Sequence, residues 1–559
     1  MKPSYVVVLL AGLGTTLAQS QSSTSTSSSA VSTGTAIPAD YSGHYRPQLH
    51  FSPPSGFMND PNGLFLDANG IYHLYYQYNP NSTIAGNQHW GHATSPDLYS
   101  WTNERIALAP YNNSYIFSGS AVVDVNNTSG FFPNQTNGVV AIYTLAGTYQ
   151  TQDIAYSTDG GYTFEIYDGN PVLNIDDANF RDPKVFWYDD GAISHWVMVV
   201  AVAQEFTVSI YTSPNLTSWS FASDFSHHGL LGTQYECPNL VRMPVHGGGD
   251  MWLMYISINP GAPLGGSIGQ YFPGEFNGTH FVPSDATTRI ADFGKDNYAG
   301  QFWSGIDGVS IAWASNWQYC NLVPTGPAEG WQSTMSLPRQ NYLRQASRNQ
   351  GLIMVSLPYN LEGLRGSEVV AQTQSLRSNG TLLADVGGGS GAFMLDVNVT
   401  GLNVTGLPST ASINFTLIAS GSQESIEGGT FIAEDATMWL DRGGIHAWDN
   451  VYFTDRFSAS LVLNNTYNFQ VVVDRSIIEV FGMEGEKSAT LVYYPESLLD
   501  TVLVKSSGLN NGVSISAAVH TLLGTWQSGI VQPNGTAVDV NGTTRALKRE
   551  LEAAWHFGY

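Results

Sequence analysis

The chain has 559 residues, of which 42% are hydrophobic, 12% aromatic and only 12% charged, and its formal net charge is −24. This length is too great for one ordinary hydrophobic core and predicts two domains. The acidic balance argues against nucleic acid and anionic membranes as partners, because phosphate groups are bound by clustered Lys and Arg side chains.

The N-terminus is typical of a secretory signal peptide, with Lys2, an apolar run over residues 5–13 and small residues up to Ala18. That run is too short to span a bilayer. Residues 19–40 follow as a Ser- and Thr-rich lead that cannot bury enough apolar surface to fold. Many Asn-x-Ser/Thr sequons along the chain fit a glycoprotein. We therefore expect a signal peptide over 1–18, a disordered lead, and a secreted protein that is extracellular or associated with the cell wall.

Between residues 41 and 360, short aromatic-rich runs alternate with clusters of turn-forming residues, a pattern that predicts strands. Such runs lie at residues 71–76, 138–143, 185–188, 195–202 and 251–256. The stretch 95–101 recurs at 213–219, and a related stretch at 157–164 lies between them. A period of roughly 60 residues suits turns between the outer strands of propeller blades and predicts about five blades.

The last part of the chain has a different pattern. A linker is expected over residues 361–385, and a Gly- and Ser-rich stretch at 387–391 follows it. Alternating runs, such as 393–397 and 469–473, then predict a β-sandwich over residues 386–559. The fold class expected for the whole chain is therefore all-β, with a five-bladed β-propeller followed by a C-terminal β-sandwich.

Three acidic residues lie in short loops of turn-forming neighbours: Asp60 in the stretch 59–63, Asp182 in 181–183 and Glu236 in 235–238. Pro and Gly beside an acid interrupt regular structure, so these carboxylates are expected at strand ends, where a rigid scaffold can aim them at a ligand. Glycoside cleavage needs one ionised carboxylate and one protonated carboxyl group. Taken singly, each acid also suits a structural role, in an Asx-turn, in an ion pair with a neighbouring arginine or on the surface.

The three motifs, in this order, resemble those of glycoside hydrolase family 32, and within it the secreted fungal and yeast invertases (β-fructofuranosidases). The resemblance extends over about residues 45–345. It is carried as well by the stretches 50–53, 75–80, 90–93, 117–120, 258–263, 292–296 and 313–317. The family has the same propeller and sandwich, which supports the expected fold.

What the resemblance implies about mechanism is a retaining hydrolase of sucrose and short fructans that needs no cofactor and no metal. Asp60 would be the nucleophile, Glu236 the general acid and base, and Asp182 a stabiliser that binds sugar hydroxyls. Further candidates for substrate binding are the polar residues Asn59, Gln77, Ser118 and Arg181 and the aromatic residues Phe57, Trp90, Phe117 and Trp313. For Trp90, Phe117 and Trp313, packing in the core is the alternative.

Some alternatives stay open at this stage. Phe57 stands where most relatives carry Trp, which removes an indole N–H beside the nucleophile, so a fructosyltransferase that makes fructo-oligosaccharides is the main alternative. A non-catalytic carbohydrate-binding protein would have lost at least one of the three acids. Residues 157–164 also resemble the Asp-box of sialidases, but the sequence has no arginine cluster for a carboxylate substrate. Whether Cys237 and Cys320 pair, and whether the chain forms a homodimer, is left undecided.

Overall fold

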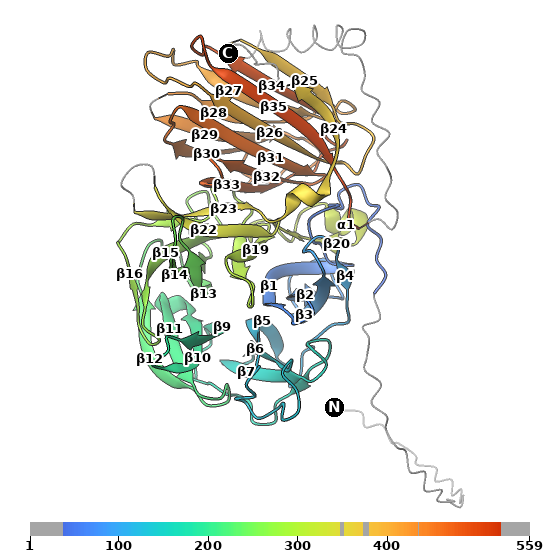
Figure 1. The fold of residues 1–559 in the computed structure, drawn as a ribbon. Helices are drawn as coiled ribbons and strands as arrows, with labels where there is room; N and C mark the ends of the chain where they lie inside the picture. The colour runs from blue at the N-terminus through green and yellow to red at the C-terminus, as the bar shows by residue number, and fades with distance from the viewer. Residues whose placement is uncertain (1–36, 347–350, 373–378, 434, 527–559) are drawn as a thin grey trace, which may run out of the picture. The chain divides into compact units, whose positions relative to one another are not determined.

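The computed structural model describes residues 37–346, 351–372, 379–433 and 435–526 (Figure 1). Two compact units divide the chain, Met1–Thr33 and Gly34–Tyr559, and every described residue belongs to the second. The expected signal peptide and all but the end of the expected lead lie outside the described residues, as does the end of the expected sandwich domain. Within the described part, no helix has the length and apolar character needed to cross a membrane.

Five sheets form the blades of a propeller, as the sequence predicts (Figure 1). Blade 1 contains β1 (Gly56–Leu66), β2 (Tyr72–Asn79), β3 (His89–Ser95), β4 (Thr102–Asn103) and β20 (Trp331–Gln332). Blade 2 contains β5 (Tyr115–Val123), β6 (Val139–Ala146), β7 (Gln150–Ser157) and β8 (Glu165–Ile166). Blade 3 contains β9 (Phe180–Asp189), β10 (Ser194–Val202), β11 (Thr207–Ser213) and β12 (Ser220–Ser226).

Blade 4 contains β13 (Tyr235–Pro244), β14 (Asp250–Ile258), β15 (Ile268–Phe276), β16 (Phe281–Pro283) and β17 (Arg289–Ile290). Blade 5 contains β18 (Tyr298–Phe302), β19 (Val309–Ala314), β21 (Thr334–Met335), β22 (Arg339–Gln345) and β23 (Leu352–Pro358). The short helices are η1 (Ala203–Glu205), α1 (Thr325–Glu329) and η2 (Leu361–Leu364). We call β1, β5, β9, β13 and β18 the inner strands, because each comes first in its blade and they contact one another.

Blade 1 closes the ring. β20 pairs in parallel with β1, where Trp331 lies opposite Gly56 and Gln332 opposite Phe57. A segment from the end of the propeller sequence therefore completes the sheet with which the propeller begins. This pairing fixes the start of β1, the strand that carries Asp60.

The repeated stretches occupy the same position in three blades. Residues 95–101, 157–164 and 213–219 each connect the third strand of a blade to its outermost strand. In the first of them, the Asp97 carboxylate accepts hydrogen bonds from the backbone N–H groups of Tyr99 and Ser100. Such side-chain bonds to the following backbone stabilise a tight turn. The predicted position of the repeat between outer strands is thus confirmed.

Two six-stranded sheets form the C-terminal sandwich. One contains β24 (Arg365–Gln372), β35 (Ser514–Leu522), β26 (Ala392–Thr400), β31 (Thr466–Asp474), β32 (Ile477–Gly482) and β33 (Lys487–Val492). The other contains β25 (Thr381–Asp385), β34 (Thr501–Ser507), β27 (Ser412–Ile418), β28 (Ser425–Phe431), β29 (Ala436–Gly444) and β30 (Arg456–Leu461). Residues 361–385, expected as a linker, instead contribute β24 and β25 to these sheets.

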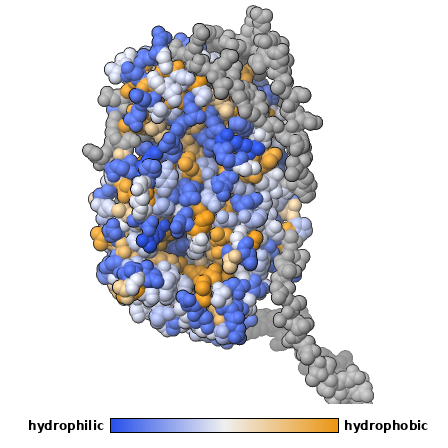
Figure 2. Space-filling view, viewed as in Figure 1, coloured by the Kyte–Doolittle hydropathy of each residue, from blue (hydrophilic) through white to orange (hydrophobic). Residues whose placement is uncertain are grey.

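Each sandwich sheet contributes alternate side chains to a shared core, for example Leu395, Val471 and Val519 from one sheet and Phe415 and Val504 from the other. This alternation is the period of two that strands require. Hydrophilic residues cover most of the molecular face in Figure 2, with smaller hydrophobic patches between them.

A buried ion network joins the propeller sequence to the sandwich. The imidazole Nδ1 of His50 lies 2.8 Å from the Asp474 carboxylate, and its Nε2 lies 3.3 Å from Glu479. Glu479 also binds the guanidinium of Arg339 at 2.5 Å, and Arg339 binds Asp292 at 3.0 Å. Burial by itself lowers the pKa of His50, but the two carboxylates outweigh it and raise the pKa to about 9. His50 is therefore a buried cation at neutral pH.

We expect His50→Gln to lower the free energy of unfolding by about 3 kcal/mol near pH 6, because it leaves two buried carboxylates without this cation. The pKa of His50 is raised above its unfolded value of about 6.5, so its contribution is complete below that pH and is lost as the pH rises through about 9. The pKa values of Asp474 and Glu479 are lowered, since their hydrogen bonds and cations outweigh burial. Their contribution is lost as the pH falls through the carboxyl range.

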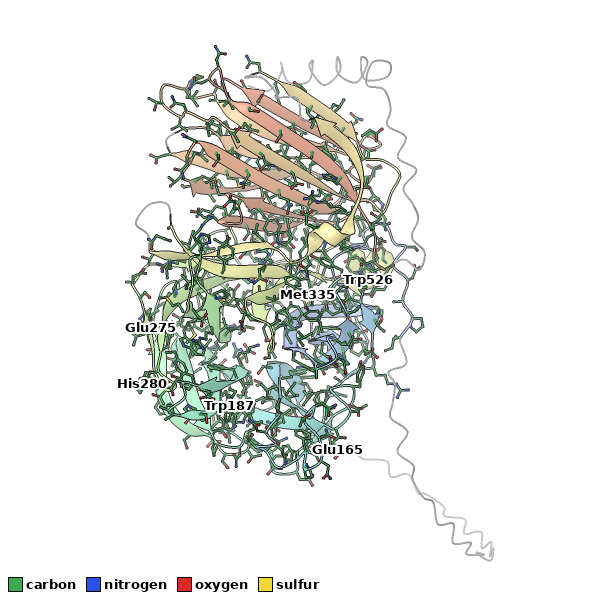
Figure 3. All side chains as sticks on the ribbon, viewed as in Figure 1. Glu165, Trp187, Glu275, His280, Met335 and Trp526 are labelled. Carbon is green, nitrogen blue, oxygen red and sulfur yellow. The ribbon has the colours of Figure 1, made fainter. Side chains whose placement is uncertain are left out.

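Thermal unfolding between about pH 5 and pH 10 checks this expectation. The midpoints of the wild type and His50→Gln should differ most below about pH 6.5 and converge toward pH 10. His280→Gln is the matched control, because His280 is exposed in a turn of blade 4 (Figure 3) and its imidazole is bonded to the neighbouring Thr279 and not to a carboxylate of the described residues. Equal midpoints for wild type and His50→Gln at pH 6 would contradict the role of the network.

Candidate active site

The three acidic motifs lie at the first residues of inner strands, where bulges interrupt the hydrogen-bond ladder. The pairing is broken at residues 59–60 of β1, 182–183 of β9 and 237–238 of β13. Each bulge contains or precedes a proline of the motif, which has no backbone N–H for the ladder. A bulge bends its strand and re-aims the neighbouring side chains. The local sequence thus directs all three carboxylates toward the axis around which the inner strands lie.

Asp60 is buried and is held by three neutral donors. Its Oδ2 accepts hydrogen bonds from the Ser118 hydroxyl at 2.7 Å and from the Cys237 thiol at 3.4 Å. Its Oδ1 accepts one from the Asn59 side chain at 3.0 Å. Burial raises the pKa of Asp60, and these hydrogen bonds oppose the rise because they favour the charged form. Asn59 and Ser118, both expected at the site, thus orient this carboxylate.

Asp182 shares a hydrogen-bond partner with Asp60. Its Oδ2 accepts a hydrogen bond from the backbone N–H of Cys237 at 3.0 Å and lies 3.6 Å from the sulfur of the same residue. Asp182 and Cys237 both have left-handed backbone conformations, with φ of 66° and 47°. Residues other than glycine rarely adopt this conformation, and where they do it often marks a functional site. Cys237 and Cys320 are both buried and free, so they do not pair.

Glu236 binds two strong donors from other blades. Its Oε1 accepts hydrogen bonds from Nε and Nη2 of Arg181, at 3.2 and 3.1 Å, and from the Gln234 side chain at 3.1 Å. Its Oε2 accepts a hydrogen bond from the Tyr298 hydroxyl. Burial raises the pKa of Glu236, and the charge of Asp60 adds to this rise, whereas Arg181 and Tyr298 oppose it. Glu236 therefore holds a proton at higher pH than a free glutamate does.

The three carboxyl groups also act on one another. Burial raises the pKa of Asp182 to about 7, with further increases from the charges of Glu236 and Asp60 and an opposing effect of Arg181. Three acids with one arginine cannot all ionise at low cost in a buried site. The site therefore retains at least one proton into the neutral range, which acid-base chemistry on a bound ligand requires.

Two buried side chains near this cluster have donors without acceptors. The side-chain nitrogen of Gln77, on β2, and the indole nitrogen of Trp313, on β19, have no hydrogen-bond partner among the described residues. Trp313 contacts Trp317 and Phe57, with ring centroids 4.9 and 6.4 Å apart. Buried donors are seldom left unpaired, so these two are available for the oxygens of a ligand. Phe57 itself is buried and forms part of this aromatic wall.

Trp90 and Phe117 have different places. Trp90 is fully buried, contacts Tyr143 in the core between blades 1 and 2, and donates its indole N–H to the backbone oxygen of Phe117 at 3.0 Å. It holds the backbone next to Ser118 and presents no free polar atom to a ligand. Phe117 is only half-buried and precedes Ser118, which contacts Asp60.

Sequence reasoning missed Tyr298 and Gln234. Tyr298 follows the recognised stretch 292–296 by two residues, and Gln234 precedes the stretch 235–238 by one, so both lie just outside stretches that were already informative. Their roles depend on contacts between β18, β13 and the start of blade 4. Sequence spacing alone does not report such contacts.

We expect Tyr298→Phe to move the alkaline limb of the pH profile of kcat/KM to higher pH. The Tyr298 hydroxyl stabilises the charged form of Glu236, so its removal raises the pKa of Glu236 further. Initial rates measured from about pH 4 to pH 9 would show the shift. Tyr319→Phe is the control, since Tyr319 is a buried tyrosine bonded to a different carboxylate, that of Asp296. If the alkaline limb of Tyr298→Phe moves to lower pH instead, the Tyr298 hydroxyl does not stabilise the charged form of Glu236.

Comparisons with known proteins give a consistent picture. Residues 50–355 match the model of the N-terminal domain of glycosyl hydrolases family 32, and residues 360–521 match that of its C-terminal domain. An extracellular exo-inulinase of Meyerozyma guilliermondii is 43% identical over 478 residues, which are 80% of this chain and 90% of the relative. An invertase of Debaryomyces hansenii is 39% identical over 510 residues, 86% of this chain and 93% of the relative.

Solved structures are similar over the same length. The structure of fructofuranosidase from Schwanniomyces occidentalis complexed with fructose has a TM-score of 0.80 and 36% identity, and the match covers 87% of this chain and 100% of that chain. The crystal structure of exo-inulinase from Aspergillus awamori has a TM-score of 0.79 and 32% identity, with 87% and 100% covered.

Proposed function

The chain belongs to glycosyl hydrolases family 32, and from this premise we propose that it is a secreted, retaining β-fructofuranosidase that cleaves the terminal fructosyl bond of sucrose and of short fructans. The observation that carries the proposal is the division of labour among the carboxyl groups. Asp60 is oriented by neutral donors, whereas Glu236 is held by Arg181 and Tyr298, and burial raises the pKa of both groups. One group suits attack on carbon and the other suits proton transfer.

In the first step, a carboxylate oxygen of Asp60 attacks the anomeric carbon of the fructosyl unit. Glu236 donates its proton to the glycosidic oxygen, the bond between that oxygen and the anomeric carbon breaks, and glucose leaves. In the second step, Glu236 takes a proton from water. The water oxygen bonds to the anomeric carbon, and the Asp60 carboxylate is released. Two displacements at the same carbon retain its configuration.

Asp182 is proposed to bind hydroxyl groups of the fructosyl ring. Its Oδ2 already accepts the Cys237 N–H, which fixes the side chain, and a carboxylate has further lone pairs for sugar hydroxyls. The unpaired donors of Gln77 and Trp313 are proposed to bind ring oxygens or hydroxyls on the same sugar. A sugar that lacks these acceptors would leave buried donors unsatisfied and would bind more weakly.

The proposed mechanism predicts an acidic pH optimum. Activity requires Asp60 ionised and Glu236 protonated, so it falls when the pH drops below the pKa of Asp60 and when it rises above that of Glu236. Both pKa values are raised by burial. A rate that stays flat from about pH 4 to pH 9 would contradict this pair of roles.

Incubation of the purified protein with concentrated sucrose tests the function. Equal release of glucose and fructose, absent in Asp60→Ala, is the result expected of a hydrolase. Retention is tested by adding methanol as acceptor, which should give methyl β-fructofuranoside. No release of glucose from sucrose or inulin would overturn the proposal.

Fructosyl transfer is the second candidate, and Phe57 is the residue that favours it. Phe57 is buried against Trp313 and Trp317 and has no N–H with which to bind water or a hydroxyl beside the nucleophile. Excess glucose with accumulating trisaccharide in the same incubation would identify a transferase. In that case, Phe57→Trp should raise the proportion of free fructose.

Secretion and self-association are part of the proposal as well. The curated exo-inulinase relatives are named extracellular, and the N-terminus is typical of a signal peptide. N-terminal sequencing of the protein recovered from culture medium should give a chain that begins after Ala18. Sedimentation of that material tests the homodimer.

A further inference from the structure

A cavity lies toward the end of the inner strands that is farther from Asp60. Its volume is about 840 Å³, and it is lined by residues from all five inner strands together with the stretch 302–308. On β1, Phe65 and Leu66 line it, five and six residues beyond Asp60. At about 3.3 Å per residue, this places Phe65 roughly 16 Å along the strand from Asp60. At Phe65 the cavity is therefore well away from Asp60, whereas at Lys184 it comes within two residues of Asp182 along β9. Its volume suits a small ligand.

Two buried donors lie in the cavity wall, and one of them, the indole N–H of Trp303, lacks an acceptor among the described residues. Lys184 is 3% exposed, and its ammonium group donates to the backbone oxygen of Phe302 at 2.6 Å. Burial lowers the pKa of Lys184 to about 7, with no carboxylate contributing to raise it. Trp303 is 4% exposed, and its indole nitrogen has no hydrogen-bond partner among the described residues. Since an unpaired buried donor is costly, the indole N–H of Trp303 is available for an oxygen atom of a ligand. Lys184 already donates to Phe302 and has further N–H groups for a second acceptor.

Aromatic rings make up much of the remaining wall. Trp187, on β9 of blade 3 (Figure 3), is 37% exposed and contacts its cross-strand partner Trp196 on β10. Trp252 also lines the cavity, half-buried, but it packs on the opposite face of the blade 3 sheet, with its ring centroid 5.3 Å from that of Phe186. The exposed indole of Trp187 and the buried donors of the same cavity provide an apolar surface and polar groups for a ligand.

The charges around the cavity decide between a neutral and an anionic ligand. Four carboxylates line it, those of Asp67, Asp159, Asp189 and Asp307. Arg242 also lines it, but it binds Asp250 at 2.8 Å. Lys184 is then outnumbered by acids, and the chain as a whole carries a formal charge of −24. This field repels anions, whereas carboxylates and indole N–H groups both bind hydroxyl groups.

We propose that this cavity, which we call the Lys184 cavity, binds a neutral mono- or disaccharide independently of the active site. Trp187 contacts the apolar face of a sugar ring. Lys184 and Trp303 donate to sugar oxygens, and the carboxylates at the rim accept from hydroxyls. The proposal goes beyond the proposed function and does not rest on it, because no step of hydrolysis involves these residues.

The test measures the fluorine NMR resonance of Trp187 as sucrose is added. Full-length Asp60→Ala protein, which cannot turn over sucrose, is labelled with 5-fluorotryptophan and titrated with sucrose while its fluorine NMR spectrum is recorded. The resonance of Trp187 is identified by its loss in Trp187→Phe. We expect this resonance to move along a saturable curve whose midpoint differs from that of Trp313 in the candidate active site.

A matched pair of surface substitutions supplies the control. Val125, which is 57% exposed, lines the cavity, whereas Val282, which is 62% exposed, lies on β16 away from it. Val125→Arg should weaken sucrose binding at Trp187 by at least about tenfold because the longer charged side chain obstructs the cavity. Val282→Arg should leave the curve unchanged. In an otherwise wild-type chain, both variants should hydrolyse sucrose at the wild-type rate.

The outcomes separate this proposal from the proposed function. A Trp187 resonance that does not move up to the solubility limit of sucrose, or one that moves equally in Val125→Arg, would overturn the Lys184 cavity as a saccharide site. Movement caused by inorganic phosphate and not by sucrose would show an anion site and would overturn it as well. Neither result bears on hydrolysis, which is measured separately by release of glucose.

Discussion

Asp60→Asn should reduce kcat for sucrose by at least about 10⁴-fold, since an amide cannot form the covalent bond to the fructosyl carbon. The fold should survive this change. Asparagine has nearly the shape of aspartate, and its carbonyl oxygen can still accept the hydrogen bonds from Ser118 and Cys237. The substitution also removes a negative charge, and burying that charge is unfavourable. Initial rates, together with thermal unfolding midpoints, measure the two effects separately.

Asp153→Asn is the matched control for this loss. Asp153 is another buried carboxylate of the propeller, on β7, and it is bonded to Thr151 and Tyr111. This substitution should keep kcat within a few-fold of wild type. Residual activity of Asp60→Asn near that of Asp153→Asn would remove Asp60 from the role of nucleophile.

Glu236→Ala should lower kcat for sucrose by about 10³- to 10⁴-fold, because glucose must then leave without a proton. The loss should be much smaller for fructosyl fluoride, since fluoride leaves without protonation. With this donor, formation of the fructosyl-enzyme is fast and attack by water, which lacks its general base, becomes limiting. Added azide should then accelerate turnover, because it is a nucleophile that needs no base.

The product of that reaction identifies the step that Glu236 serves. Azide should displace Asp60 from the anomeric carbon and give β-fructosyl azide, which NMR distinguishes from the α-anomer. Acceleration by azide should be absent in Asp60→Asn, which forms no intermediate. If azide does not accelerate Glu236→Ala, or if the α-azide forms, Glu236 is not the acid and base of a retaining reaction.

Much of the arrangement around these acids could be predicted because it is local. A proline one residue after Asp60 and Asp182, and two residues after Glu236, indicates a break in a strand, and each break is a bulge near the start of an inner strand. Likewise, the repeat at 95–101 and 213–219 predicts the same turn in two blades, because side chains such as Asp97 bond to the backbone a few residues away.

The remainder depends on contacts between distant parts of the chain. Arg181 and Tyr298 meet Glu236 from blades 3 and 5, and no pattern around Tyr298 indicates which carboxylate it contacts. The linker expected over 361–385 was wrong for the same reason, because its structure depends on distant parts of the chain. Its strands β24 and β25 are fixed by pairing with β35 and β34, which are more than a hundred residues away along the chain. Trp90 is a core residue because blade 2 covers it.

The ion network around His50 bears on how far this enzyme can be treated as a set of interchangeable modules. A propeller produced without its sandwich would retain His50 and Arg339 but lose Asp474 and Glu479, so two buried cations would lose acidic partners. A chimera that joins this propeller to a foreign sandwich meets the same requirement. It should be soluble only if the donor supplies both acids at matching positions, which makes this pair a criterion for choosing parents in recombination.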